Sequence, residues 1–542
     1  MGVIAKQSIR GTIVTYLGVA VGFVTTFFVL TRFLTAEEIG LARVLIDAAT
    51  LFVSLAQLGT SSSIIRFYPY FREQGQRTKD KGQRTKDKYV STADIDKGLP
   101  VLTPNACGEV GLQQKAKPTD HGFFFWTLVI PLVGFVLFAL IYCACHVPLS
   151  QWFGEKSPEF VDYYYFVLPL AFFLLYQTIF ETNANVRMRI VVPRAVRELV
   201  TRVGLLAVYL LYAFRVLSMD GFVMALCGVY ALAALCNIVY LFSLGDISLR
   251  PDWSFVRTHR PLVRQYLYYT GFLIISALAS ALAPTLSSFF ITAKMGLNYT
   301  GIYAIATYIA VMVSIPYRSM TAIAAPQLAA SIKEQDRTQT AHLMQQVSQN
   351  LLLVGGFIFC LIWLNIDLIF HILPNGDTYA TARMVVLILG VCQILIATFS
   401  FCLSAISYSR YYIFSLVLSF ILTISAIALN NFLIPRYGMN GAAVSTLLSN
   451  ALYFLLAVVV VRVALRIRLF STRHLKTLLL LGAVLLLNYL WQRYLPLSNI
   501  WLSSIVRTLV LCGAACAAAW FGRLSPEINE QVKKYALRLR HK

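Results

Sequence analysis

Long apolar runs alternate with short polar connections from Gly11 to Gly522. A run of about 20 residues, as a helix that rises about 1.5 Å per residue, crosses the roughly 30 Å hydrocarbon core of a bilayer. The pattern therefore predicts an all-α, polytopic membrane protein with about fourteen transmembrane helices. We expect these helices at residues 11–34, 41–66, 122–146, 161–182, 196–216, 221–244, 267–293, 299–325, 348–372, 380–404, 411–434, 440–463, 475–495 and 500–522.

Lys and Arg residues are dense on every second connection between these runs, as in the stretch from Arg250 to Arg264. The remaining connections mostly hold a single basic residue, such as Lys156 or Arg436. Basic flanks near the ends of a transmembrane helix are retained in the cytoplasm. Together with the even number of helices, the pattern predicts that both termini are cytoplasmic.

The first six and the next six helices read as two copies of one unit. The turn that contains Gly40 resembles the turn that contains Gly301, and the stretch from Asn183 to Arg187 resembles the stretch from Ser404 to Arg410. Halves with the same orientation imply parallel repeats about an axis along the membrane normal. We expect an N-terminal lobe at 1–244, a cytoplasmic linker at 245–266, a C-terminal lobe at 267–464, and two further helices with a basic cytoplasmic tail at 465–542.

Residues 73–120 form the longest hydrophilic connection, and they interrupt the first lobe. The heptad that starts at Gly75 repeats letter for letter from Gly82. Such a polar, repetitive stretch has too little apolar surface to offset its ordering entropy. We therefore expect a flexible cytoplasmic insertion, whose role the sequence leaves open.

Composition agrees with a membrane domain, with 58% hydrophobic and only 13% charged residues. The net charge of +22 could suggest a nucleic-acid partner, but that charge is spread over short loops and a tail. Cytoplasmic retention and contact with anionic lipid headgroups explain it without nucleic acid. The seven histidines are scattered, and nine of the ten cysteines fall in apolar runs, so we expect no metal site, no disulfide framework and no cofactor. The nucleotide-binding and hydrolase motifs that would indicate an enzyme do not occur.

The richest candidate site is a polar stripe in the second apolar run. Charge and polarity are costly in hydrocarbon, so such residues are the first functional candidates in a membrane helix. The spacings of 4, 3, 4, 3 and 4 would place six side chains on one face of one helix, lining water or a polar partner. A pairing of the first two members one turn apart, with hydroxyls bonded to neighbouring helices, is the alternative. The stripe consists of Arg43, Asp47, Thr50, Ser54, Gln57 and Ser61.

Further candidates lie in other apolar runs. Glu181 belongs to a set spaced by four residues with Gln177 and Asn185, and Arg318 ends a weaker polar stripe in the eighth run. Arg32, Arg66, Arg202 and Arg507 complete the set, although Arg32 and Arg66 could simply extend toward the interface. The Gly18-x-x-x-Gly22 spacing in the first run predicts a close-packing helix face instead of a chemical role.

Several short motifs resemble the Wzx-type oligosaccharide flippases, often called polysaccharide biosynthesis proteins. These belong to the superfamily that also holds multidrug exporters and lipid II flippases. The resemblance covers nearly the whole chain except 73–120, and its motifs are helix-turn patterns. They are Ser8-Ile-Arg-Gly-Thr12, Phe33-Leu-Thr-Ala-Glu-Glu-Ile-Gly-Leu41, Arg66-Phe-Tyr-Pro-Tyr-Phe71, Gly301-Ile-Tyr-Ala-Ile-Ala306 and Tyr437-Gly-Met-Asn-Gly-Ala-Ala443.

The resemblance implies a V-shaped, two-lobe carrier with a cationic cavity in the bacterial inner membrane. Its substrate would be a polyprenyl-pyrophosphate-linked oligosaccharide, moved from the cytoplasmic to the outer leaflet by alternating access. Such a flippase serves the biosynthesis of surface polysaccharides such as lipopolysaccharide O-antigen, capsule or exopolysaccharide. Membrane lipids, a polysaccharide polymerase and chain-length machinery are the partners that it implies.

Two other classes remain open at this stage. A cation-coupled multidrug exporter of the same superfamily typically carries acidic residues in its first and seventh helices, and residues 11–34 and 267–293 hold none. A lipid II flippase or a membrane glycan polymerase is the second alternative. A polymerase generally needs a large extracytoplasmic loop with several acids, which the apolar pattern does not provide.

Overall fold

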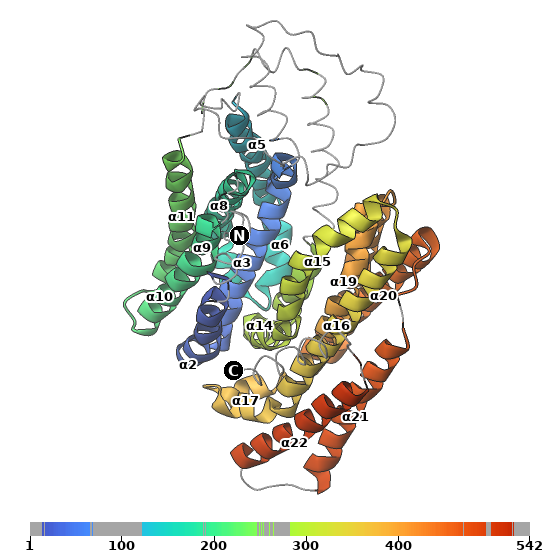
Figure 1. The fold of residues 1–542 in the computed structure, drawn as a ribbon. Helices are drawn as coiled ribbons and strands as arrows, with labels where there is room; N and C mark the ends of the chain where they lie inside the picture. The colour runs from blue at the N-terminus through green and yellow to red at the C-terminus, as the bar shows by residue number, and fades with distance from the viewer. Residues whose placement is uncertain are drawn as a thin grey trace, which may run out of the picture. The chain divides into compact units, whose positions relative to one another are not determined.

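The apolar runs fold as helices in the computed structural model, which is drawn in Figure 1. The structure describes residues 17–65, 122–187, 191–245, 282–469, 471–494 and 500–522, together with isolated positions between and beyond these ranges. Every regular element in these ranges is a helix. The predicted insertion at 73–120, most of the linker at 245–266 and the basic tail after 524 lie outside the described residues.

The chain divides into two compact units. The first unit lies within residues 1–25, 45–151 and 161–281. The second unit lies within residues 26–44, 152–160 and 282–542. The first apolar helix, Leu17–Phe33, passes from the first unit to the second and includes η1 (Thr25–Leu30) and α2 (Thr31–Phe33). Helix α3 (Ala36–Ala56) returns to the first unit.

The first unit is completed by a series of helices between residues 123 and 243. They are α5 (Phe123–Ala144), α6 (His146–Gly154), α7 (Pro158–Asp162), η4 (Tyr164–Phe166), α8 (Val167–Val186), α9 (Val191–Ala195), η5 (Val196–Val200), α10 (Thr201–Ala213) and α11 (Met219–Ser243). Parts of α6 and α7 belong to the second unit. Helix α8 packs between α5 and α11. Phe124, Phe180 and Ala234 from these three helices share one buried cluster.

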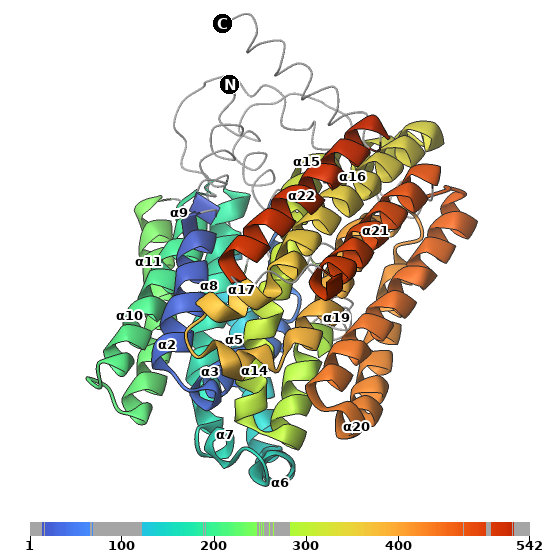
Figure 2. The same ribbon diagram turned by 90° about the horizontal axis from the view of Figure 1, so that it is seen from below.

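The second unit holds the remaining helices. They are α14 (Leu297–Val311), η6 (Met312–Ser314), α15 (Ile315–Lys333), α16 (Arg337–Leu364), α17 (Ile366–Ile372), α18 (Gly376–Ala380), α19 (Arg383–Tyr408), α20 (Ile413–Val460), η7 (Val461–Leu465), α21 (Thr472–Tyr494) and α22 (Ile500–Phe521). Helix α19 packs between α16 and α20, whereas α21 and α22 lie side by side against α16 (Figure 2).

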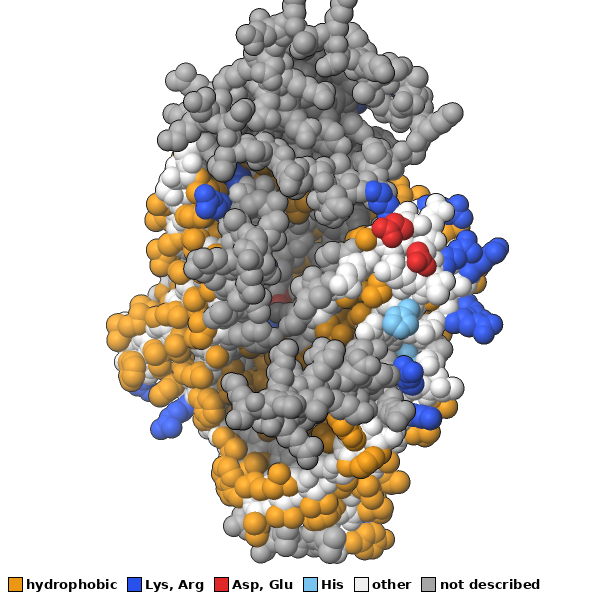
Figure 3. Space-filling view, viewed as in Figure 1, with side chains coloured by type: hydrophobic (Ala, Val, Ile, Leu, Met, Phe, Trp, Pro, Cys, Tyr) orange, Lys and Arg blue, Asp and Glu red, His pale blue; other side chains and the backbone are white. Residues whose placement is uncertain are grey.

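The all-helical membrane fold that the sequence predicts is confirmed. Ten described helices are long and apolar enough to cross a membrane, and Leu17–Phe33 is a shorter apolar helix. Hydrophobic side chains also cover much of the described surface in Figure 3, as expected for a surface that faces lipid. The count of fourteen crossings and the cytoplasmic termini stay predictions.

Two predicted helices are joined in α20, which runs through a kink. Gly438 has φ 57° and ψ −136° inside this helix, three residues after Pro435. Proline removes a backbone donor, and glycine is the residue that takes a positive φ without steric cost. The predicted helices 411–434 and 440–463 therefore correspond to the two arms of α20.

The sequence pattern predicted one continuous helix for the second apolar run, and the structure shows that this prediction is wrong. Helix α3 ends at Ala56, and a separate helical turn resumes at Thr60. Leu58 and Gly59 between them have φ of 48° and 70°, the left-handed conformation that ends helices. Gly134 of α5 packs on this break, where an added Cβ would lie 2.2 Å from the Ala56 backbone oxygen.

Gly40 and Gly301, which lie in the two similar turns of the sequence, meet at one helix crossing in the second unit. A Cβ added at Gly301 would lie 1.8 Å from the backbone oxygen of Ala36, and one at Gly40 would lie 2.0 Å from that of Leu297. Helices α3 and α14 thus touch backbone to backbone, because no side chain separates them there.

Candidate functional site

The predicted polar stripe is divided by the end of α3. Thr50 and Ser54 lie on the helix, and their hydroxyls donate to the Ile46 and Thr50 backbone oxygens at 2.8 and 2.9 Å. Gln57 and Ser61 lie beyond the helix end, although the Ser61 hydroxyl still donates to Gln57 Oε1 at 2.9 Å. The interpretation of six residues on one continuous helix is therefore wrong at Gln57 and Ser61.

Arg43 and Asp47 lie near the middle of α3, where charge is most costly. Asp47 is buried, with 6% of its surface exposed, and Arg43 is half-buried. The Arg43 guanidinium lies 5.5 Å from the centre of the Tyr308 ring on α14, in a cation–π arrangement within the second unit. This contact places the guanidinium against the face of an aromatic ring.

The first unit contains a four-residue network of ion pairs, which we call the α8–α10 network. Glu181 on α8 lies 3.0 Å from the Arg197 guanidinium of η5. Glu198 lies 3.5 Å from Arg197 and 2.9 Å from Arg202 on α10. The structure thus brings together two predicted candidates, Glu181 and Arg202, through two residues that the prediction had not selected.

A π-helical turn positions the centre of the α8–α10 network. Residues Val196–Val200 form η5, in which the wider turn places Arg197 toward α8 and Glu198 toward α10. Such turns are rare and occur frequently at functional sites. The turn therefore supplies two charged side chains at a point that an ordinary amphipathic pattern would not mark.

The first helix closes on this network through the predicted glycine face. A Cβ added at Gly18 would lie 2.5 Å from the Glu198 backbone oxygen, and one at Gly22 would lie 2.6 Å from the Arg202 guanidinium. The Arg202 guanidinium also donates to the Gly18 backbone oxygen at 2.7 Å. The close-packing role of these glycines is confirmed.

The α8–α10 network differs in exposure from one member to the next. Only 11% of each glutamate side chain is exposed, whereas 29% of Arg202 and 50% of Arg197 are exposed. Arg197 is therefore the most exposed member of the network, while two buried carboxylates hold its orientation. A guanidinium fixed in this way suits the two-pronged binding of a phosphate or carboxylate.

Two predicted candidates, Arg66 and Arg318, have side chains that the structure does not describe. Arg66 is not among the described residues, and for Arg318 the structure describes only its place on α15. In the same polar stripe, the hydroxyls of Thr307 and Ser314 donate to backbone oxygens one turn earlier in their own segment. These two hydroxyls are thus satisfied within their own segment.

Arg507 on α22 has a structural partner. It is buried, with 4% of its surface exposed, and its guanidinium donates to the Leu364 backbone oxygen at the end of α16. Thr508 donates to Asn365 Oδ1 at 3.1 Å beside it. A cation at the carboxyl end of a helix is stabilised by the helix dipole, so Arg507 fastens α22 to α16.

Two features of the structure are not among the predicted candidates. The first is the pair Arg197 and Glu198 on the π-helical turn. The second is a small polar cavity between the starts of α16 and α21. The lining residues on the two helices are more than 120 positions apart in the sequence. Among the residues that the structure describes, no group of three His, Cys, Asp or Glu side chains could hold a metal ion.

Comparisons with solved structures identify the fold. The lipid II flippase MurJ in its inward closed conformation aligns with a TM-score of 0.63 and 12% identity, covering 95% of this chain and 99% of that chain. The Vibrio cholerae MATE transporter VcmN in its bent form gives a TM-score of 0.52 at 15% identity, covering 85% and 97%. An inward-facing multidrug resistance MATE family transporter gives 0.57 at 12% identity, covering 82% and 96%.

The sequence matches no family model, and no curated protein matches it. The fold is therefore assigned from the similarity to solved structures alone. These neighbours are transporters and flippases, not enzymes. The chain is a multi-pass membrane protein whose fold is similar to those of the lipid II flippase MurJ and the MATE transporters.

Proposed function

We propose that this protein is a flippase that moves a polyprenyl-pyrophosphate-linked oligosaccharide across the bacterial inner membrane, from the cytoplasmic to the outer leaflet, for surface-polysaccharide biosynthesis. The observation that carries the proposal is the half-exposed side chain of Arg197, whose guanidinium is held in the α8–α10 network by Glu181 and Glu198. A pyrophosphate offers the paired oxygens that such a donor binds best.

The fold supports a lipid-linked substrate over a free drug. The lipid II flippase covers 95% of this chain, whereas the two MATE transporters cover 82% and 85%. The sequence also lacks Asp and Glu in residues 11–34 and 267–293, where the exporter resemblance implied ion-coupling acids. Both observations favour the flippase over the multidrug exporter.

Electrostatics gives the transport a direction. A pyrophosphate carries negative charge, and an inside-negative potential favours its outward movement by about 2.3 kcal/mol per charge per 100 mV. Arg197 and Arg202 of the first unit would compensate that charge during the crossing. Polysaccharide polymerase and chain-length proteins would then act on the product in the outer leaflet.

The experiment uses the full chain in liposomes that contain a fluorescent polyprenyl-pyrophosphate oligosaccharide, with dithionite bleaching as the measure of translocation. We expect Arg197→Gln to lose most of the activity and Arg197→Lys to retain part, because Lys keeps the charge but not the two-pronged geometry. The matched control is Arg215→Gln, because Arg215 is an exposed arginine of the turn after α10.

Two results would contradict the proposal. Normal translocation by a well-inserted Arg197→Gln variant would remove Arg197 from the substrate site. Transport of cationic drugs, without translocation of the lipid-linked probe by the unmodified protein, would instead support the exporter.

A further inference from the structure

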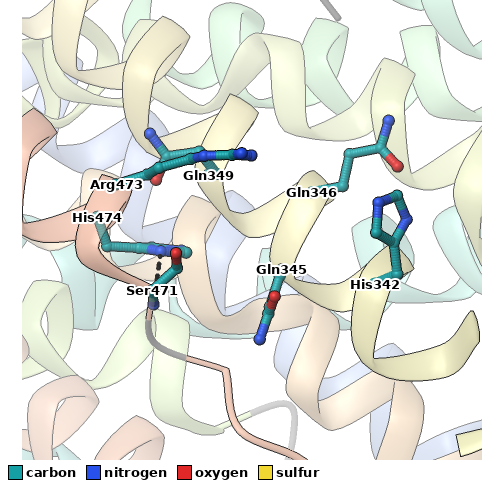
Figure 4. Close-up of a pocket in the computed structure, with 7 residues that line it drawn as sticks. All are labelled: His342, Gln345, Gln346, Gln349, Ser471, Arg473 and His474. Atoms are coloured by element: carbon teal, nitrogen blue, oxygen red, sulfur yellow. Dashed lines mark hydrogen bonds between the residues drawn. The ribbon is translucent and has the colours of Figure 1, made fainter. Parts of the chain in front are cut away.

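A small polar cavity of about 50 Å³ lies between the first turns of α16 and α21 in the second unit (Figure 4). Helix α16 contributes one histidine and three glutamines, and the start of α21 contributes Ser471, Arg473 and His474. None of the lining residues is acidic. A single water needs about 10 to 15 Å³ of such space, so the cavity has room for a larger polar group.

The connection before α21 forms one wall of the cavity. Arg466 and Arg468 are exposed, whereas Ile467 and Leu469 alternate with them and are buried in the apolar cluster of this unit. Gln345 of α16 donates to the Arg468 backbone oxygen at 2.5 Å. The wall is therefore fixed on its apolar side and basic on its outer side.

His474 joins the two helices. Its Nδ1 accepts the Ser471 backbone N–H at 3.3 Å, so a neutral ring carries its hydrogen on Nε2. That Nε2 lies 3.2 Å from the Ser348 hydroxyl of α16, to which it can donate. Both ring nitrogens thus have structural partners, and the fixed cation of the cavity is Arg473.

Gln349 lines the cavity and carries a buried hydrogen-bond acceptor. Its Nε2 donates to Thr477 Oγ1 at 2.7 Å and to the Leu524 backbone oxygen at 3.2 Å. Because a backbone oxygen can only accept, the amide cannot be turned around. Gln349 is 4% exposed, and its Oε1 is buried without a hydrogen-bond partner. Such an atom indicates a ligand that donates a hydrogen bond.

The surroundings favour an anion attached to an apolar chain. Exposed basic residues lie on both sides of Arg473, namely Arg468 before it and Lys476 after it, and Figure 3 shows Lys and Arg side chains gathered near two histidines on the visible face. The start of α21 adds the positive end of its helix dipole. Leu475 and Leu479 on the first turns of α21 are 61% and 65% exposed, next to these charges.

The nearest acidic residues in the sequence do not neutralise the cavity. Asp336 caps α16, where its carboxylate accepts the Gln339 backbone N–H at 2.9 Å. Within the described ranges, no carboxylate forms an ion pair with Arg473 or His342.

We propose that this cavity binds the headgroup of an anionic, hydroxyl-bearing glycerophospholipid, such as phosphatidylglycerol, from the cytoplasmic leaflet. Arg473 and His342 contact the phosphate, and Gln349 Oε1 accepts a hydrogen bond from a headgroup hydroxyl. The acyl chains follow the exposed leucines of α21. Basic pockets between transmembrane helices on the cytoplasmic side are known to suit such headgroups, and the proposal does not depend on the transported substrate.

The test measures lipid binding to the full, delipidated chain in detergent by native mass spectrometry. Three lipids with the same acyl chains are compared: phosphatidylglycerol, phosphatidylmethanol, which keeps the charge but has no hydroxyl, and phosphatidylcholine. We expect phosphatidylglycerol to bind tightest and phosphatidylcholine weakest. This comparison uses the unmodified protein, so it does not depend on the folding of any variant.

Substitutions then locate the site. Arg473→Gln should weaken phosphatidylglycerol binding about tenfold or more, as loss of a charged hydrogen bond implies. Arg337→Gln, at the exposed start of α16 and outside the cavity, is the matched control and should bind normally. Gln349→Met should abolish the preference for phosphatidylglycerol over phosphatidylmethanol.

Three outcomes would overturn the proposal. Equal binding of all three lipids would show that the cavity does not select a headgroup. Equal weakening by Arg473→Gln and Arg337→Gln would indicate general surface charge. Displacement of phosphatidylglycerol by millimolar inorganic phosphate would identify free phosphate, not a lipid, as the ligand.

Discussion

Helices α8 and α19 hold corresponding places in the repeat that the sequence predicts, yet their ends differ. Near the end of α8, Glu181 enters the α8–α10 network with Arg197. Near the end of α19, Phe401, Cys402 and Ala405 are buried in an apolar cluster that includes Leu418 of α20. The two helix ends therefore differ in character, with an ion-pair network near the end of α8 and an apolar cluster near the end of α19. A binding site for a charged substrate is thus expected to be asymmetric.

The largest loss of stability should come from a substitution in the apolar cluster of α19. Phe401→Ala removes a ring that is 1% exposed, and we expect it to lower the free energy of unfolding by about 3 to 5 kcal/mol. Thermal unfolding in detergent measures this change. Phe414→Ala, at a ring that is 45% exposed on α20, should have little effect. Similar losses at the two positions would mean that the α19 cluster is not a packed core.

A smaller loss of stability is expected from a substitution in the α8–α10 network. Glu198→Gln leaves Arg202 and Arg197 without one carboxylate, and partial exposure of Arg202 reduces the cost to about 2 kcal/mol. The double change Glu198→Gln, Arg202→Gln should recover part of that loss, because no uncompensated charge remains. A double-mutant cycle on unfolding temperatures measures the coupling. Strictly additive effects would show that the two side chains do not interact.

The smallest stability effect should be that of Arg197→Gln. Half of this side chain is exposed, so its ion pairs contribute about 0 to 1 kcal/mol. Unfolding temperatures at low and high salt measure that contribution. A small change in stability together with a large loss of translocation would separate binding from folding. A loss of stability as large as that of Phe401→Ala would instead make Arg197 a structural residue.

The fold was predictable because hydropathy and spacing act over short stretches of sequence. The apolar runs marked the helices, and the four-residue spacing of Gly18 and Gly22 marked a face that packs closely against Glu198 and Arg202. The break after Ala56 was harder to predict, because Leu58 is not a residue that usually adopts a positive φ. The six-residue stripe therefore seemed continuous in the sequence.

The candidate site was only partly predictable, because it depends on contacts distant in sequence. Glu181 and Arg202 were found as charges inside apolar runs. Arg197 and Glu198 sit on a π-helical turn, for which the sequence carries no simple periodic signal. The cavity between α16 and α21 combines residues such as Ser348 and His474, whose proximity only the tertiary structure reveals.

The hydrogen bond from Gln349 to Thr477 also has a consequence for the order of biosynthesis. The two residues are 128 positions apart, so a ribosome that adds about 5 to 20 residues per second completes α21 roughly 6 to 26 s after α16. During that interval the buried amide of Gln349 has no partner from α21, and a buried polar group is costly until it is satisfied. The newly made α16 must therefore be sheltered, by the insertion machinery or by lipid headgroups, until the last two helices arrive.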